Sequence, residues 1–208
     1  MMWELRFDEP LDAWAVVPAP DEYERRRQWG AVVADMVRAY WEAEEDAPFS
    51  DALDQVLEML QRSRPEGALA DLVTWPTRSP LPVRVTFHVA ADDGATEWES
   101  LGFEASPYLP SPFGEGIQYS RRISPELTQG IASIDAAIIF DRGDAALVVR
   151  IHACPLDAYM MAATAIAELI DSCVLTDSTG SAFATGKREH LLPGESDQWL
   201  EEGTSIGV

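Results

Sequence analysis

The sequence lacks the short motifs by which many enzyme classes are recognised. It has no paired CxxC elements, no GxxxxGK[ST] phosphate-binding loop, no GxGxxG after a predicted strand and no HExxH. Its three histidines, His88, His152 and His190, are too far apart in the chain to have the spacing of metal ligands. We therefore expect no metal ion and no cofactor, and a binding protein more readily than an enzyme.

Basic residues are scarce. The chain has 15 Lys and Arg against 36 Asp and Glu, a formal charge of −21, and only Lys187 of its basic residues is a lysine. Such a charge disfavours nucleic acid and anionic membranes as partners, and it favours either a plain solvated surface or a basic protein partner. The preference for arginine and alanine indicates a GC-rich bacterial genome, and we expect an actinobacterial source. Composition leaves the oligomeric state open.

Long apolar runs are also missing. No stretch approaches the ~18 apolar residues of a membrane helix, and the opening residues MMWELRFDEP do not form a secretory signal, so we expect a cytoplasmic protein. The two cysteines, Cys154 and Cys173, lie at opposite ends of a predicted helix. Their separation of about 28 Å along that helix is far beyond the ~7 Å limit for a disulfide.

The clearest pattern is a predicted β-hairpin over residues 133–152. With Arg142 and Gly143 at the turn, or with a four-residue loop in the same register, every second residue of both strands is apolar. This register places Asp135 directly opposite Arg150 on the other face, where their charges are complementary. We expect the apolar face to be buried beneath the helix that follows, and its main members are Ile134, Ile138, Phe140, Leu147, Val149 and Ile151.

Three helices are expected. One begins at a capping box of Asp21 and Glu24, the second begins with Ser50 as its cap, and the third begins at Pro155, whose fixed φ suits the first helical turn. Apolar residues at helical spacing predict the buried side of each helix. For the first helix they are Trp29, Val32, Val33, Met36, Val37 and Tyr40.

Strands occupy most of the remaining chain. Two short strands joined by a turn open the chain, and another strand is expected from Thr96 toward Phe103. The order of elements predicts an α+β fold, with a mostly antiparallel sheet of six to eight strands and three helices packed on it. We expect residues 1–176 to form a single domain, and residues 177–208 to form a C-terminal tail that is extended or loosely packed, with Trp199 as its one large apolar contact.

A proline-rich segment, residues 106–116, is the first candidate binding site. Its prolines and glycines argue against regular structure, whereas Tyr108, Leu109 and Phe113 supply apolar surface. We interpret these three residues as anchors for a protein partner. The alternative is that the aromatic side chains close one end of the core.

A second candidate site is catalytic. Arg150, His152 and Cys154 alternate along one predicted strand, and Cys154 precedes a helix, where a helix dipole and a nearby cation lower a thiol pKa. These residues define the alternative of a thiol-dependent enzyme. Against it, a free cysteine is usually a small buried side chain, and Arg150 already has Asp135 as its expected partner.

The ending ALVVRIHACPLDAYMMAATAIAELIDSCVLTD, together with the tryptophan-bearing N-terminal hairpin, resembles the Mog1/PsbP-like fold. The resemblance covers residues 1–176, with Ser172, Cys173 and Val174 where that family usually closes with Ser-Phe. It implies a non-enzymatic binding or accessory protein. No functional residue is carried over from it, so the expected mode of docking rests on the aromatic loop and the acidic surface.

Overall fold

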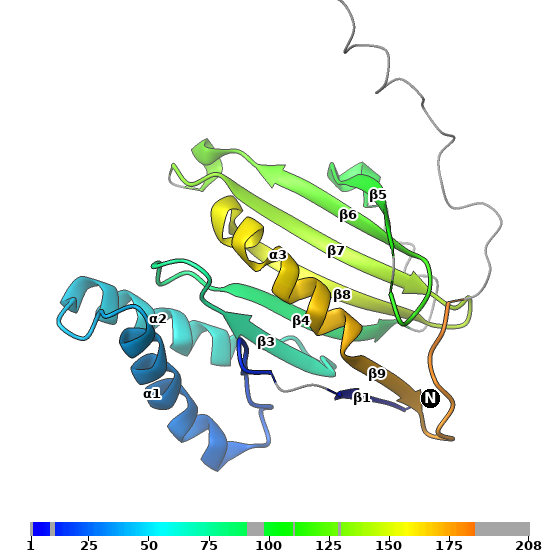
Figure 1. Ribbon diagram of the computed structural model, residues 1–208, viewed down its shortest axis with the longest axis horizontal. Helices are drawn as coiled ribbons and strands as arrows, with labels where there is room; N and C mark the ends of the chain where they lie inside the picture. The colour runs from blue at the N-terminus through cyan, green and yellow to red at the C-terminus, as the bar shows by residue number, and fades with distance from the viewer. Residues whose placement is uncertain (1, 9–10, 91–97, 110, 129, 186–208) are drawn as a thin grey trace, which may run out of the picture.

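The computed structural model describes residues 2–8, 11–90, 98–109, 111–128 and 130–185, and these form a seven-stranded sheet, a two-stranded sheet and three α-helices (Figure 1). Every pairing between the named strands is antiparallel. In spatial order the larger sheet contains β2 (Ala15–Val16), β3 (Ala70–Thr74), β4 (Val83–Ala90), β8 (Ala146–Pro155), β7 (Ser133–Asp141), β6 (Gly116–Ile123) and β5 (Glu104–Tyr108). The predicted α+β class, with a mostly antiparallel sheet and three helices, is confirmed.

The helices lie on opposite faces of the larger sheet. Helix α3 (Leu156–Asp171) crosses one face, whereas α1 (Tyr23–Tyr40) and α2 (Ala47–Arg62) form a helical hairpin that packs on the other face near β3 (Figure 1). Side chains alternate along β3, so Leu72 joins the core under α3 and Val73 joins the core under α1 and α2. Two hydrophobic cores therefore share one sheet.

The six apolar residues of the predicted hairpin are buried as expected, with exposed fractions of 8% or less. Its register, however, is two residues away from the prediction. Ala137, not Asp135, lies opposite Arg150, and the register shifts again between Ile134 and Ala136. A shift of two residues keeps each side chain on its face, which is why the burial was predicted correctly while the pairing was wrong.

The N-terminal strands do not pair with each other. Strand β1 (Trp3–Phe7) pairs with β9 (Cys173–Asp177) at the other end of the described chain, and β2 pairs with β3. The predicted N-terminal hairpin is therefore wrong. Trp3 and Phe7 instead pack edge-on against Phe183 and Phe87, respectively, at ring-centroid distances of 5.5 and 5.7 Å.

Two of the predicted helix starts need correction. Asp46, not Ser50, caps α2 by accepting a hydrogen bond from the Phe49 amide at 3.1 Å. The N-cap of α1 is Glu22, whose carboxylate accepts from the Ala19 amide at 2.7 Å, outside the helix. The third helix begins directly after Pro155, as predicted.

The chain between β4 and β6 also differs from the prediction. Within its described part, residues 99–101 form a 3₁₀ turn (Glu99–Leu101) instead of a strand, and the expected strand residues 96 and 97 lie outside the described residues. Strand β5 continues to Tyr108 through Pro107, which an edge strand tolerates because one side of it forms no ladder. A second 3₁₀ turn (Pro125–Leu127) precedes β7.

The chain packs on the body beyond residue 176. The Phe183 amide donates to the Leu175 carbonyl oxygen at 2.8 Å, and the Phe183 ring is buried. The Thr185 amide donates to the Phe113 carbonyl oxygen, also at 2.8 Å. The rest of the predicted tail, including Trp199, lies outside the described residues.

Candidate functional site

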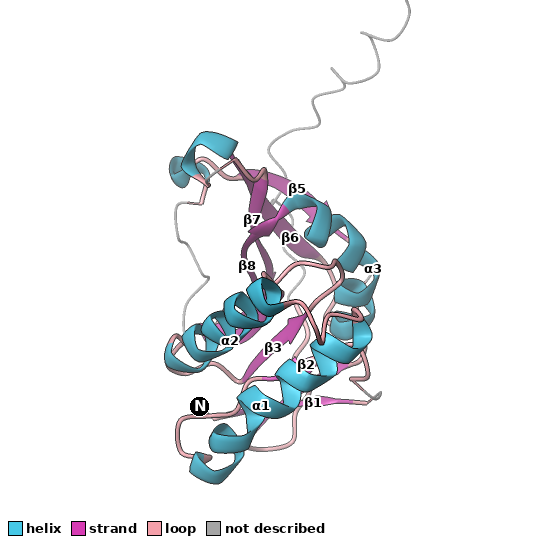
Figure 2. Cartoon of the chain, turned by 90° about the vertical axis from the view of Figure 1, so that its left-hand side faces the viewer, coloured by secondary structure: helices cyan, strands magenta, loops and turns pink. Residues whose placement is uncertain are grey.

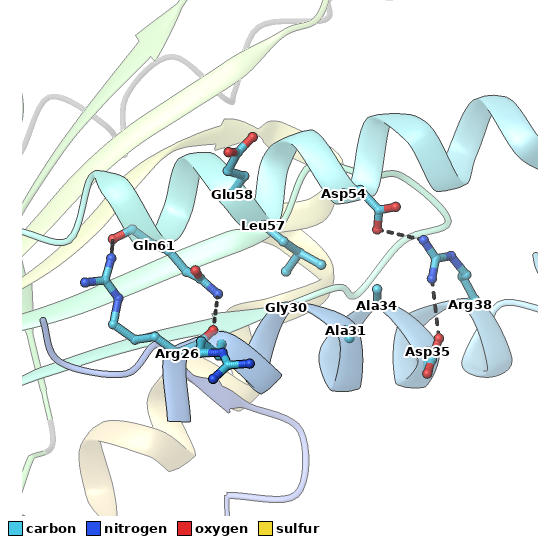
Figure 3. Close-up of a pocket in the computed structure, with 11 residues that line it drawn as sticks. Arg26, Gly30, Ala31, Ala34, Asp35, Arg38, Asp54, Leu57, Glu58 and Gln61 are labelled. Atoms are coloured by element: carbon cyan, nitrogen blue, oxygen red, sulfur yellow. Dashed lines mark hydrogen bonds and ion pairs between the residues drawn. The ribbon is translucent and has the colours of Figure 1, made fainter. Parts of the chain in front are cut away.

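A groove of about 460 Å³ lies between α1 and α2 (Figure 3). Small side chains of α1 form its floor, because Gly30, Ala31 and Ala34 follow one another at helical spacing along the side that faces α2. Leu57 of α2 completes the apolar part. Ala34 and Leu57 are also part of the core under the hairpin, so the groove has a rigid base.

One end of the groove is held by a reciprocal pair of hydrogen bonds. The Arg26 guanidinium donates to the Gln61 carbonyl oxygen, and the Gln61 amide donates to the Arg26 carbonyl oxygen, both at 3.2 Å (Figure 3). Arg27, next along α1, is exposed, and its partner Glu24 is 3.8 Å away. Cationic groups therefore gather at this end.

The opposite end carries both signs of charge. Arg38 pairs with Asp54 at 2.7 Å and with Asp35 at 3.4 Å (Figure 3). Its Nε also donates to the Ser50 hydroxyl at 3.1 Å. These contacts join the end of α1 to the start of α2. They fix the width of the groove from the second end.

The charge of the two helices differs from that of the rest of the chain. Together α1 and α2 contain five arginines and five acidic residues, so their formal charge is zero. The whole charge of −21 therefore lies outside them. The connection between the two helices is nevertheless acidic, with Glu42, Glu44, Glu45 and Asp46.

Gly30 is unusual because it lies in the middle of α1. Glycine there costs roughly 0.5–1 kcal/mol relative to alanine, since it loses more backbone freedom on folding. A Cβ at this position would meet nothing closer than the Gln61 Nε2 atom at 3.5 Å, which is ordinary contact. Packing between the helices therefore does not require glycine, whereas an open groove floor benefits from it.

The predicted catalytic residues are not on one face. In the β7–β8 pair, Ile151 lies opposite Ala136 and Cys154 lies opposite Ile134, so β8 has one extra residue in this interval. This bulge reverses the alternation of side chains between the two faces of β8. Cys154 joins the core under α3, while the His152 ring bonds to Thr86 Oγ1 at 3.0 Å on the other face. The expectation of a shared face is wrong because of this bulge.

The electrostatics of Cys154 are also opposite to those of a reactive thiol. Burial raises its pKa to about 12, and the nearby charges of Asp135 and Asp157 act in the same direction. A thiol at this pKa is protonated at neutral pH. The described surroundings therefore do not activate Cys154 as a nucleophile.

The contacts of Arg150 are with an ion-pair partner and aromatic rings of the fold. It pairs with Asp135 at 2.5 and 2.6 Å, diagonally across the two strands, and Arg121 donates to the same carboxylate at 3.3 Å. The Arg150 guanidinium also lies 5.0 Å from the Trp98 ring centre and 5.4 Å from that of Phe103. This cluster holds the segment after residue 97 against the sheet.

The three predicted anchors are divided between core and surface. The Phe113 ring is buried and packs 5.3 Å from Phe140 and 6.0 Å from Phe183. Tyr108 is half-buried and meets Phe140 edge-on at 5.9 Å, whereas Leu109 is 63% exposed. Phe113 thus matches the core-closing alternative, and the expectation that it is displayed to a partner is corrected.

The groove was not found by sequence reasoning. The contacts across it join residues 16 to 35 positions apart in the chain, and hydrophobic periodicity does not predict which helices lie side by side. The only signal within the sequence was Gly30 followed by Ala31 and Ala34 in a helical segment.

Within the described part of the chain, no group of three or more His, Cys, Asp or Glu residues is placed to hold a metal ion. The helices of that part include none long and apolar enough to cross a membrane. The described residues therefore form an α+β protein whose groove lies on the helical hairpin of α1 and α2.

No protein-family model and no curated protein matches the chain. Among solved structures, LpqN of Mycobacterium tuberculosis, described as involved in cell envelope biogenesis, is similar over 85% of each chain, with 14% sequence identity and a TM-score of 0.43. Likeness at that level supports no statement about activity. The Mog1/PsbP-like resemblance, the cytoplasmic location and the actinobacterial source stay predictions.

Proposed function

We propose that this protein is a non-enzymatic binding protein that takes an apolar side chain of a protein partner into the groove between α1 and α2. The observation that carries the proposal is the zero formal charge of these two helices in a chain of charge −21, at the place where the groove lies. Protein interfaces combine apolar contact with arginine. The groove has both, since Leu57 and the small side chains of α1 lie between arginines.

The groove also defines the chemistry of the partner. Its floor of Gly30, Ala31 and Leu57 fits an aliphatic side chain, such as leucine or methionine. Arg26 and Arg27 at one end attract a carboxylate. The partner segment is therefore one with an aliphatic anchor and an acidic residue near it.

Panning a random peptide library against the immobilised protein tests the proposal without knowledge of the natural partner. We expect enriched peptides that pair an aliphatic residue with Asp or Glu, and we expect their binding to shift the backbone NMR signals of Gly30 and Ala31. Ala31→Trp should weaken binding by about tenfold or more, because the indole occupies the groove mouth, whereas Ala163→Trp on α3 should not. Equal binding by both variants would contradict the proposal.

Gly30→Ala provides a second test with two readouts of opposite sign. It should stabilise the fold by about 0.5–1 kcal/mol, since a Cβ has room and the unfolded chain loses freedom. It should also weaken peptide binding, because the methyl group narrows the floor. A gain in stability without loss of binding would show that the groove floor does not need glycine.

The second candidate is docking of a basic partner through the aromatic loop and the acidic surface. It is supported by the exposure of Leu109, by the half-buried Tyr108 beside it, and by the location of all the net charge outside α1 and α2. The same NMR experiment separates the two candidates. Shifts at Leu109 and Tyr108 with basic peptides, and loss of binding in Leu109→Ala, favour the loop.

A further inference from the structure

Leu127 is the most exposed large apolar side chain of the described residues. It is 81% exposed and lies in the 3₁₀ turn between β6 and β7, directly after Glu126, which is also exposed. Ile131, in the same loop, is 42% exposed. An aliphatic side chain with an acidic neighbour is the chemistry that the groove between α1 and α2 is proposed to bind. We refer to residues 124–128 as the Leu127 turn.

Hydrogen bonds hold the Leu127 turn in one conformation. The Leu127 amide donates to the Ser124 carbonyl oxygen at 3.0 Å, and the Thr128 amide donates to that of Pro125 at 3.1 Å. The Thr128 hydroxyl donates to the Ile131 carbonyl oxygen. A side chain on a preorganised turn costs less ordering entropy when it binds than one on a loose segment. The turn therefore presents Leu127 in a form suited to binding.

We infer that the groove of one copy of this chain takes up Leu127 of a second copy, with Glu126 of that copy directed toward Arg27. The inference rests on the proposed function, because it names a partner for the same groove. Leu57 and the small side chains of α1 receive the leucine. The ion pair of Arg27 with Glu24 is exposed and 3.8 Å long. Such a pair contributes little, so Arg27 stays available to a carboxylate.

The segment that carries the Leu127 turn is an exception to the acidic character of the chain. Residues 116–132 contain two arginines, Arg121 and Arg122, and one acidic residue, Glu126. Arg122 is exposed shortly before the turn. The copy that supplies the turn therefore brings a net positive segment to the helical hairpin, whose connection is acidic. Charge does not oppose the contact, which the exposed leucine and the apolar groove floor favour.

One copy does not place its own Leu127 in its own groove. Strand β6, which leads into the turn, is separated from β3 by β4, β8 and β7, and at a strand spacing of about 4.8 Å this separation is about 19 Å. The loop after β6 lies away from α1 and α2 in both views (Figures 1 and 2). The contact is therefore heterologous: a dimer keeps one free groove and one free turn, so association continues unless a ring closes.

Sedimentation velocity of the full chain between about 10 μM and about 1 mM tests the inference. A contact centred on one side chain buries less area than a stable interface, so we expect weak and reversible association. The weight-average sedimentation coefficient should rise with concentration. A chain that stays monomeric over the whole range overturns the inference, while the peptide-binding test of the groove keeps its own outcome.

Two variants of equal charge locate the contact. Leu127→Asp should lower the association constant by at least about tenfold, because a carboxylate replaces the aliphatic anchor. Leu101→Asp should leave it unchanged, since Leu101 lies in the other 3₁₀ turn and is 52% exposed. Both side chains are exposed, so neither change should alter the melting temperature. Equal association by the two variants overturns the inference.

A mixture of two blocked variants gives the sharpest test. Ala31→Trp fills the groove mouth but keeps the Leu127 turn, whereas Leu127→Asp keeps the groove but lacks the anchor. Each variant alone should be monomeric, and their equimolar mixture should form a 1:1 dimer that grows no further, because each such pair has one intact groove and one intact turn. A mixture that stays monomeric or forms larger assemblies overturns the inference. Failure of Leu127→Asp to bind the selected peptides would contradict the proposed function instead.

Discussion

At the scale of single residues, burial decides the chemistry of the ionisable groups on the central strands. Cys154 and His152 are close in sequence, yet each is held in its neutral form: burial raises the thiol pKa to about 12 and lowers the imidazole pKa to about 4. The positive charges of Arg84 and Arg150 add to the effect on His152. The neutral His152 ring is hydrogen-bonded to Thr86, which is typical of a buried side chain with a structural role.

Both cysteine thiols should be unreactive in the folded protein. Burial raises the pKa of Cys173 as well, so neither thiol forms a thiolate at pH 8. Titration with a chromogenic disulfide reagent should therefore find no fast-reacting thiol in the native state and two in guanidinium chloride. A native thiol that reacts as fast as a free cysteine peptide would restore the thiol-enzyme alternative.

His152 should make stability depend on pH. Its folded pKa of about 4 lies below its ordinary value of 6.5, so the unfolded chain takes up a proton first as the pH falls. The stability that neutral His152 provides is complete above pH 6.5 and is lost progressively as the pH falls toward 4. The carboxylates of the chain titrate in the same window, so the comparison must be made with a variant.

Urea denaturation of the native chain and of His152→Gln at several pH values measures this effect. The difference in unfolding free energy between the two should change by on the order of 3 kcal/mol between pH 7 and pH 4, in the direction that disfavours the native chain at low pH. A difference that stays constant over this range would show that His152 is not held neutral.

At the scale of elements, the segment between β5 and β6 has two sides with different roles. Phe113 faces the core and the chain beyond β9, where its carbonyl oxygen accepts from Thr185. Leu109 faces solvent. The segment therefore joins the end of the described chain to the sheet, while it leaves one aliphatic residue free for contact with a partner.

Single alanine variants should separate these roles. Phe113→Ala should cost about 3–5 kcal/mol of unfolding free energy, because it removes a buried ring and leaves a cavity. Leu109→Ala should change stability by less than about 0.5 kcal/mol, since the side chain is exposed. Urea melts measure both, and a small effect of Phe113→Ala would support the anchor hypothesis instead.

At the scale of the whole molecule, a buried ion pair joins the helical hairpin to the sheet. Arg84 donates to both carboxylate oxygens of Asp71 at 2.9 and 2.7 Å, and to the hydroxyl and carbonyl oxygens of Ser63 at 2.8 and 3.1 Å. Ser63 is the C-cap of α2, so the orientation of the helical hairpin on the sheet depends on this cluster. The groove is placed by it.

Breaking this pair should be far more costly than breaking a surface pair. Asp71→Ala should destabilise the fold by about 3–5 kcal/mol, because Arg84 is left buried and uncompensated. Asp35→Ala, which breaks an exposed pair with Arg38, should cost at most about 1 kcal/mol. Equal costs in urea denaturation would contradict the role assigned to the cluster.

Much of the fold follows from patterns that lie within single elements. Alternation along residues 134–151 predicted which six side chains are buried. Pro155, followed by apolar residues at helical spacing, predicted α3. These predictions hold because the direction of a side chain relative to its own strand or helix is set by local backbone geometry.

Other features required the tertiary structure, because they depend on which distant segments meet. The bulge in β8 that separates Cys154 from His152 and the pairing of β1 with β9 have no local signal, and the groove between α1 and α2 has only the small residues of α1. Helix α1 shows the limit most clearly. Its apolar residues cover more of its circumference than one neighbouring layer can bury, and only packing decided that Trp29 lies inside while Val32, Met36 and Tyr40, which were predicted to be buried, lie outside.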